Sequence, residues 1–294
     1  MIQPALKHDA LLADIAAARN DTYNMMYLWW LGQSGFLMQY QNRHLLLDPY
    51  LSDSLTNKYA DTDKPHVRMT ERCIDPQRLD FINVVTSSHN HTDHLDADTL
   101  IPLINTNPSM KIIIPEANRE FVANRLNIDL DTPIGLADAQ STTVAGFEFH
   151  GIPAAHDELA TDEHGNHKFM GYVVKFGPWC IYHSGDTLLY DGLEERLRKF
   201  DIDLAFLPIN GKLPERRVAG NLWGREAAKL AHDVGVTAVF PCHYDMFTFN
   251  TETTDEFVSE CERLGQDYRV LQCGERWPLG LLSDLEIPRQ GETP

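Results

Sequence analysis

The 294-residue sequence predicts a single α/β domain spanning residues 1–294, with two β-sheets and the helices on their outer faces. Short apolar runs separated by turns dominate the first part of the chain, which indicates a β-meander. After Asp80, apolar runs of strand length alternate with helical patterns, which indicates β-α units. No repeat period and no linker rich in Gly, Ser or Pro divides the chain, so we expect one domain.

The N-terminal region predicts one helix followed by the meander. Leu11, Leu12 and Ile15 recur at helical spacing, so we expect a helix over about residues 5–19. Its polar face is acidic, which favours packing on the domain over a membrane anchor. We expect strands over residues 27–31, 35–40 and 44–48, and a long polar loop with room for a short helical turn over residues 52–76.

The rest of the chain predicts strands and helices in alternation. Short strands are expected between residues 132 and 152, and Gly177-Pro178 predicts a hairpin turn. The other expected strands cover residues 82–86, 111–114, 169–176, 179–183, 204–209, 236–240 and 270–277. The expected helices cover residues 98–105, 116–126, 188–200, 225–234 and 252–264.

The charge balance argues against several classes of protein. The chain has 25 Lys and Arg against 43 Asp and Glu, a net charge of −18. Nucleic acids and anionic membranes are bound mainly through Lys and Arg contacts to phosphate, so we expect neither as a partner. Five cysteines without a CxxC pair, and an N-terminus with acids where a signal peptide has its apolar stretch, favour a reduced, cytoplasmic protein.

Residues 86–96 carry the clearest chemical signal. They place His89, His91, Asp93 and His94 directly after the strand expected over residues 82–86. Two imidazoles at i and i+2 in an extended or turning segment can aim at one point, and the Asp93-His94 pair can aim at a second point nearby. Because imidazole nitrogens and carboxylate oxygens are ligands of Zn²⁺ and Mn²⁺, the pattern predicts a metal site.

The motif HxHxDH after a strand resembles the metallo-β-lactamase superfamily. This resemblance implies a four-layer αββα sandwich with a site for one or two metal ions at its edge. It also implies three further ligands, each after a later strand, and the chain offers His156, Asp186 and His243. In that scheme Asp186 bridges two sites, which are formed by His89, His91 and His156 and by Asp93, His94 and His243.

The resemblance further implies a hydrolase. A bridging Asp186, where a zinc β-lactamase has Cys, argues against antibiotic hydrolysis. The strings Trp-Leu-Gly-Gln-Ser-Gly-Phe at 30–36 and Leu-Asp-Pro-Tyr-Leu-Ser at 47–52 resemble the L-ascorbate-6-phosphate lactonase-like family. That family implies hydrolysis of a small, anionic, phosphorylated sugar-acid lactone through a metal-activated hydroxide. Asp93 and Asp186 would be the catalytic carboxylates, with Asp93 orienting the hydroxide.

Two other functions stay open. Residues 89–96 also resemble the N-acyl-phosphatidylethanolamine phospholipase D branch, which hydrolyses phosphodiesters. A non-catalytic metal-binding module is a third class, although seven competent ligand residues do not favour it. The expected cofactor is one or two divalent ions, Mn²⁺ or Zn²⁺, and a homo-oligomer is compatible with the sequence.

Other polar residues have two interpretations each. Asp48 can orient a ligand histidine or form a turn before Pro49. His183 can support the metal site or act as an acid-base group, or it can cap a strand end by bonding to backbone. The basic cluster of Lys212, Arg216 and Arg217 binds a substrate phosphate or lies in solvent.

Three further features are interpreted as structural. The segment 32–35, Gly-Gln-Ser-Gly, is too short for a phosphate loop and predicts a tight turn. His150 is expected to be a strand side chain, and His66 a surface or packing residue.

Overall fold

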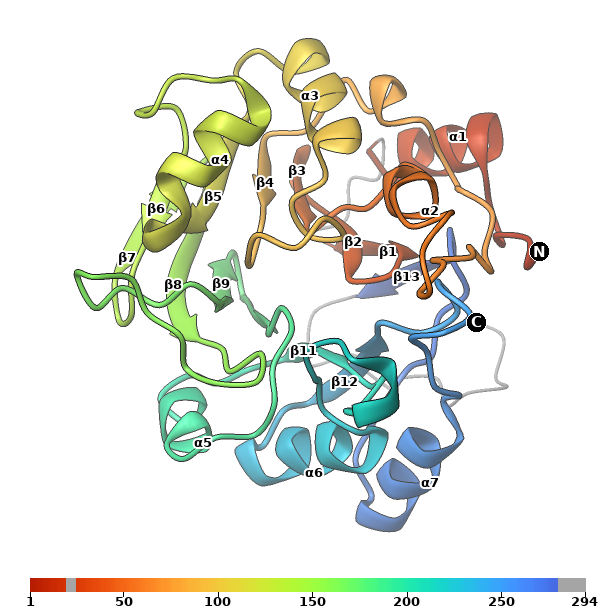
Figure 1. Ribbon diagram of the computed structural model, residues 1–294, viewed down its shortest axis with the longest axis vertical. Coiled ribbons are helices and arrows are strands. Elements are labelled where there is room, and N and C mark those ends of the chain that lie inside the picture. The colour runs from red at the N-terminus through yellow and green to blue at the C-terminus, as the bar shows by residue number, and fades with distance from the viewer. Residues whose placement is uncertain (20–24, 280–294) are drawn as a thin grey trace.

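The computed structural model describes residues 1–19 and 25–279, and two β-sheets pack face to face in it between two layers of helices (Figure 1). The first sheet has the order β13-β1-β2-β3-β4-β5-β6. Its strands are β1 (Met26–Gly32), β2 (Gly35–Tyr40), β3 (Arg43–Leu47), β4 (Val84–Thr86), β5 (Lys111–Pro115), β6 (Ile134–Leu136) and β13 (Arg276–Leu279). This arrangement is the αββα sandwich that the sequence predicts.

The second sheet has the order β12-β11-β10-β9-β8-β7. Its strands are β7 (Ser141–Val144), β8 (Phe147–Pro153), β9 (Met170–Phe176), β10 (Trp179–His183), β11 (Leu204–Pro208) and β12 (Ala238–Cys242). The helices α1 (His8–Arg19), α2 (Ser54–Lys58), α3 (Ala97–Thr106) and α4 (Arg119–Leu126) lie on the side of the first sheet. The helices α5 (Leu193–Leu197), α6 (Gly224–Val234) and α7 (Asp255–Leu264) lie on the opposite side (Figure 1).

Aromatic side chains fill the space between the sheets. Phe36 on β2 lies 4.4 Å from Phe206 on β11, measured between ring centroids, and Tyr40 on β2 lies 5.7 Å from Phe176 on β9. Phe36 and Phe206 are completely buried. Burial of a Phe side chain contributes about 1.5–3 kcal/mol, so these contacts fix how the two sheets stack and hence how their edges meet.

The strand directions bring three loops to one edge of the second sheet. The strands β10, β11 and β12 are parallel, and β8 and β10 both run antiparallel to β9. The carboxyl ends of β8, β10 and β12 therefore lie at the same edge. His156, Asp186 and His243 follow these three ends within three residues, as residues at a binding edge of an α/β sheet do.

Several expected elements differ from the observed ones. The α-helix expected over residues 116–126 is confined to α4, that expected over residues 252–264 to α7, and the strand expected over residues 236–240 lies two residues later as β12. Three further differences have a local cause. The helix expected over residues 188–200 is only α5, because Leu188 bonds to Ala155 in the extended segment before it and Gly192 (φ +93°) precedes the helix. The strand expected over residues 270–277 is confined to β13, because a turn closes between Gln272 and Glu275. The first helix begins at His8, because residues 2–5 bond to Met69 and Cys273.

The described residues contain neither a disulfide bond nor a membrane-spanning helix. All five cysteines are free and buried. Within the part of the chain that the structure describes, no helix has the length and apolar character to cross a membrane.

Candidate metal centre

The motif residues follow β4 in a tight turn. The backbone N–H groups of His94 and Leu95 donate to the carbonyl of His91 at 3.1 and 2.8 Å. Asp96 then ends the turn by accepting a hydrogen bond from the N–H of Asp98 in the first turn of α3. The turn separates His89 and His91 from Asp93 and His94, so that the two pairs serve two adjacent groups of side chains.

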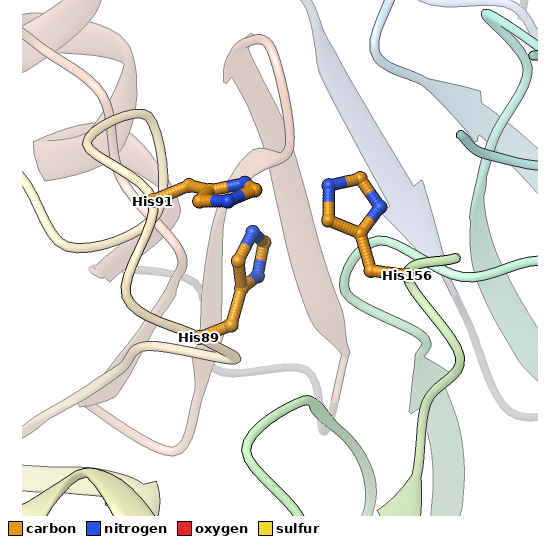
Figure 2. A group of neighbouring side chains, drawn as sticks. All are labelled: His89, His91 and His156. Carbon is orange, nitrogen blue, oxygen red and sulfur yellow. The ribbon is translucent and has the colours of Figure 1, made fainter. Parts of the chain in front are cut away.

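The first group consists of His89, His91 and His156, whose rings point toward one another (Figure 2). One ring nitrogen from each residue lies within 4.8 Å of the other two. His156 Nδ1 donates to the carbonyl of Gly220 at 2.8 Å, which leaves Nε2 free to bind an ion. His89 Nε2 is buried and has no hydrogen-bond partner among the described residues.

Reduced contact with water keeps the imidazoles of this group neutral, although His91 is the exposed member of the three. It lowers the pKa of His89 well below its usual value, the pKa of His91 less strongly, and the pKa of His156 to about 4. Neutral imidazole is the form that binds metal ions. The first group is therefore ready to accept a cation near pH 7 without losing a proton.

The second group consists of Asp93, His94, Asp186 and His243. His94 Nε2 lies 3.3 Å from Asp186 Oδ1, and His243 Nε2 lies 3.5 Å from both Asp93 Oδ2 and Asp186 Oδ2. Asp186 Oδ2 also lies 3.7 Å from His156 Nε2 in the first group. Asp186 is thus the carboxylate that both groups share.

The second group balances two carboxylates against two imidazoles. Burial favours the neutral acids, but His94 and His243 outweigh it and lower the pKa of Asp93 and of Asp186. Burial likewise opposes charge on the histidines, yet the two carboxylates raise the pKa of His94 well above its usual value and that of His243 to about 9. Without a cation, this group therefore holds its protons at neutral pH.

Asp48 orients one histidine of the second group. Its Oδ2 accepts a hydrogen bond from His94 Nδ1 at 2.8 Å, and its Oδ1 accepts one from the Thr86 hydroxyl at 2.7 Å. The backbone N–H and hydroxyl of Ser88 donate to the same carboxylate. Because His94 Nδ1 is occupied, His94 Nε2 is directed at Asp186, as in the carboxylate–histidine pairs of metal sites.

His183 contacts backbone. Its Nε2 donates to the carbonyl of Ser34 at 2.9 Å, and its Nδ1 accepts from the N–H of Gly185 at 3.3 Å. The ring therefore fixes the start of the loop that carries Asp186. This geometry corresponds to the strand-end interpretation of His183.

We expect Gly185→Ala to disturb the position of Asp186. Gly185 has φ +59°, and an added Cβ would lie 2.5 Å from Ser88 Cβ and 3.0 Å from the Met170 carbonyl oxygen. Gly192→Ala is the matched control, because Gly192 also has positive φ but has no atom within 4 Å of the added Cβ. Urea denaturation should show a loss of unfolding free energy larger by about 1–3 kcal/mol for Gly185→Ala. Equal losses would mean that the contact with Ser88 relaxes without cost.

Gln33 is a site residue that the sequence interpretation missed. Its side chain is fully buried, and Nε2 donates to Asp93 Oδ2 at 2.8 Å and lies 2.9 Å from His243 Nε2. The backbone carbonyl of Gln33 accepts a hydrogen bond from the backbone N–H of His243 at 3.1 Å. Gln33 and His243 both have positive φ, +51° and +65°, a strained conformation that is typical of functional sites. The turn expected at 32–35 is present, but its second residue points into the site.

The two groups lie at the base of a cavity of about 370 Å³. His91, Asp93, His156, Asp186 and His243 all contribute to its lining. The remaining walls combine aromatic and basic side chains, which include Tyr59, Phe247, His66, Lys58, Lys64, Arg125 and Arg217. The cavity is thus locally basic in an acidic chain.

Of the basic cluster Lys212, Arg216 and Arg217, one residue lines the cavity and two do not. Arg217 lines the cavity and also pairs with Asp63 at 2.5 Å. Lys212 and Arg216 are not among the described residues that line it, because Lys212 pairs with Asp157 and Arg216 with Glu252. These two ion pairs hold the loop instead.

The match to known proteins agrees with this geometry. The model of the Beta-lactamase superfamily domain matches residues 43–244. A UPF0173 metal-dependent hydrolase of Caldivirga maquilingensis is 28% identical over 251 residues, which is 84% of this chain and 94% of that protein.

Solved structures share the fold. A metallo hydrolase from Ignicoccus hospitalis superposes with a TM-score of 0.64 at 19% identity, covering 87% of this chain and 99% of the other. The metallo-beta-lactamase fold protein YhfI from Bacillus subtilis superposes with a TM-score of 0.62 at 18% identity, with the same coverage of 87% and 99%. Because the family model matches more than half of the chain and covers all seven grouped His and Asp residues, this chain belongs to the Beta-lactamase superfamily domain family.

Proposed function

We propose that this chain is a metal-dependent hydrolase, with Mn²⁺ or Zn²⁺ held by His89, His91 and His156 and by Asp93, His94, Asp186 and His243. One observation carries the proposal: the two groups share Asp186 at the base of a cavity. His89 Nε2, His94 Nε2 and Asp186 Oδ1 are buried and make no hydrogen bond among the described residues, although the last two face each other at 3.3 Å. Such atoms are costly unless something pairs with them, and a donor set of imidazole and carboxylate fits either cation.

The residues of the site would have separate roles in hydrolysis. When bound, a divalent cation acts as a Lewis acid that lowers the pKa of water and stabilises negative charge on the substrate. Asp93 lies at the cavity, where its carboxylate can accept a hydrogen bond from the attacking water and orient it. Asp48 holds His94 in place, and Asp186 links the two groups. Most of the site is buried, which limits competing water and strengthens these electrostatic interactions.

The cavity favours a small anionic substrate. Lys58, Lys64 and Arg125 supply positive charge around it, while Arg217 is paired with Asp63. A volume of about 370 Å³ suits a ligand of modest size. A lactone of a sugar acid that carries a phosphate has this size and charge. The same cations would also accept a phosphodiester, so the substrate panel must include one.

Elemental analysis followed by a substrate panel tests the proposal. The purified protein is stripped with a chelator, reloaded with Mn²⁺ or Zn²⁺, and assayed on a set of lactones and on an aryl phosphodiester. We expect two equivalents of metal and metal-dependent opening of an anionic lactone. Hydrolysis of the phosphodiester alone would replace the lactonase by the phosphodiesterase, and retained activity in the stripped protein would contradict the proposal.

Metal uptake by the stripped protein should release protons. His94 and His243 have raised pKa values, about 9 for His243, so both are protonated at pH 7 and must lose their protons to bind a cation. The first group, with lowered pKa values, should release none. Affinity of the second group should thus rise as the pH increases toward about 9. A pH indicator in weak buffer, with His243→Ala as the comparison, measures the release; no release from the wild type would contradict this assignment.

A further inference from the structure

His66 lies in the cavity wall although it belongs to none of the metal-ligand groups. It follows α2 in the long loop before β4, far in sequence from the motif. Asp93 lies near enough to His66 to oppose the lowering of its pKa, so the imidazole and the metal centre share one electrostatic environment. From the sequence, only a surface or packing role is expected for this residue.

The His66 ring is held by aromatic neighbours. It stacks on Tyr59 with ring centroids 4.3 Å apart, and meets Phe249 and Phe247 edge-on at 4.4 and 5.2 Å. Phe247 belongs to a small buried cluster with Tyr50, Leu55 and Met246, which anchors this wall apart from the main core. Thr56 fixes the backbone by donating to the His66 carbonyl at 2.7 Å. The ring is therefore set in one orientation before any ligand arrives, which reduces the entropy cost of binding.

The hydrogen bonding of His66 defines what its free nitrogen can do. Nδ1 donates to the carbonyl of Lys64 at 2.9 Å, so the neutral ring carries its proton on Nδ1. Nε2 has no hydrogen-bond partner among the described residues and is not among their buried unpaired atoms. Burial lowers the pKa of His66, which keeps the ring neutral near pH 7. Nε2 is thus an acceptor and cannot protonate a leaving group.

Basic side chains line the same cavity as this acceptor. Lys58 and Lys64 both act on His66 electrostatically, and with Arg217 they line the same cavity. Lys58 has no carboxylate partner among the described residues. A ligand whose anionic group meets these cations places its neighbouring substituents near His66, and a substituent that bonds to Nε2 must carry a hydrogen.

We propose that His66 determines specificity by accepting a hydrogen bond from a substrate hydroxyl group, so that the cavity takes the anion of a hydroxylated acid or a hydroxylated lactone that carries an anionic group. This inference rests on the proposed function, because it places the substrate in the same cavity. It narrows the substrate from a small anion to one that carries a hydroxyl beside its charge. His66 is assigned no part in bond cleavage.

The test compares two ligands on metal-loaded protein. Calorimetry measures binding of 2,3,4-trihydroxybutanoate and of butanoate to the wild type, to His66→Phe, which keeps the aromatic contacts but loses the acceptor, and to His66→Gln, whose amide oxygen can replace it. We expect the wild type to prefer the hydroxylated anion. His66→Phe should reduce that preference by about 5- to 10-fold, the size of one neutral hydrogen bond, and His66→Gln should restore most of it.

The controls separate this role from a structural one. His232→Phe changes an exposed histidine outside the cavity lining and should leave the preference unchanged, and elemental analysis should give equal metal content in all variants. The proposal is overturned if the wild type binds both anions equally, if His66→Phe keeps the preference, or if His66→Gln loses as much as His66→Phe. If binding follows the expectation while no lactone is hydrolysed, the proposed function fails and the assignment of His66 stands.

Discussion

Asp186→Ala is expected to abolish turnover and to reduce the bound metal in both groups, whereas His89→Ala should deplete only the first group. The reason is the position of the Asp186 carboxylate, which lies 3.7 Å from His156 Nε2 on one side and 3.3 Å from His94 Nε2 on the other. Loss of a residue that only orients a metal ligand typically costs 10- to 100-fold in affinity or activity. Removal of a carboxylate shared by two groups should exceed the upper end, so we expect a loss of more than about 100-fold in kcat/KM.

The comparison of variants makes this prediction specific. Each variant is equilibrated with one equivalent of metal ion more than its sites require, and its bound metal is compared with that of the wild type. Asp186→Ala should lose metal from both groups, whereas His89→Ala or His243→Ala should lose it from one. His150→Ala is the control, because His150 lies on β8 beside Glu148 and belongs to neither group. If Asp186→Ala lost no more metal than His89→Ala, the carboxylate would not be shared.

The motif residues could be predicted because their geometry is local. His89, His91, Asp93 and His94 lie in one turn after one strand, and the turn itself separates them into two pairs. His156, Asp186 and His243 are distant in sequence, but strand direction brings their loops to one edge. Alternating strands and helices predict an α/β domain with two sheets, whereas the four-layer order and the composition of the two groups come from the resemblance to the metallo-β-lactamase superfamily.

Residues whose role depends on three-dimensional packing could not be predicted in this way. Gln33 resembles any polar turn residue until β1 and β2 place it between Asp93 and His243. His66 reaches the cavity only because an aromatic cluster folds the loop after α2 over the site. Conversely, Lys212, Arg216 and Arg217 cluster in sequence, but each is paired with a carboxylate from elsewhere in the chain. Charge in a sequence does not reveal whether a partner already neutralises it.

Asp48→Ala should both destabilise the protein and weaken metal binding at the second group. The completely buried carboxylate accepts hydrogen bonds from His94, Thr86 and Ser88, and all of these donors would lose their partner at once. Removing one member of a buried charged pair costs about 3–5 kcal/mol. Because His94 would also lose its fixed orientation, metal affinity should fall by about 10- to 100-fold.

Asp203→Ala separates the two effects of Asp48. Asp203 is also buried and accepts a hydrogen bond from the N–H of Cys180 at 2.7 Å, but it lies in neither metal group. Urea denaturation of the stripped proteins should show a stability loss for both variants, while metal titration should show a loss of affinity only for Asp48→Ala.

The pH dependence of the stability of Asp48→Ala gives an independent check. Burial raises the pKa of Asp48, but hydrogen bonds and charge from His94 and charge from His183 outweigh it and lower the pKa. Its stabilising contribution is therefore complete above the unfolded value of about 4 and is lost as the pH falls below that. Between about pH 5 and pH 6, above the unfolded value of Asp48 and below that of His94, the difference in stability between wild type and Asp48→Ala should consequently be constant, and it should shrink in more acidic solution. A difference that did not change with acid would mean that Asp48 stabilises the fold through its shape and not through its charge on His94.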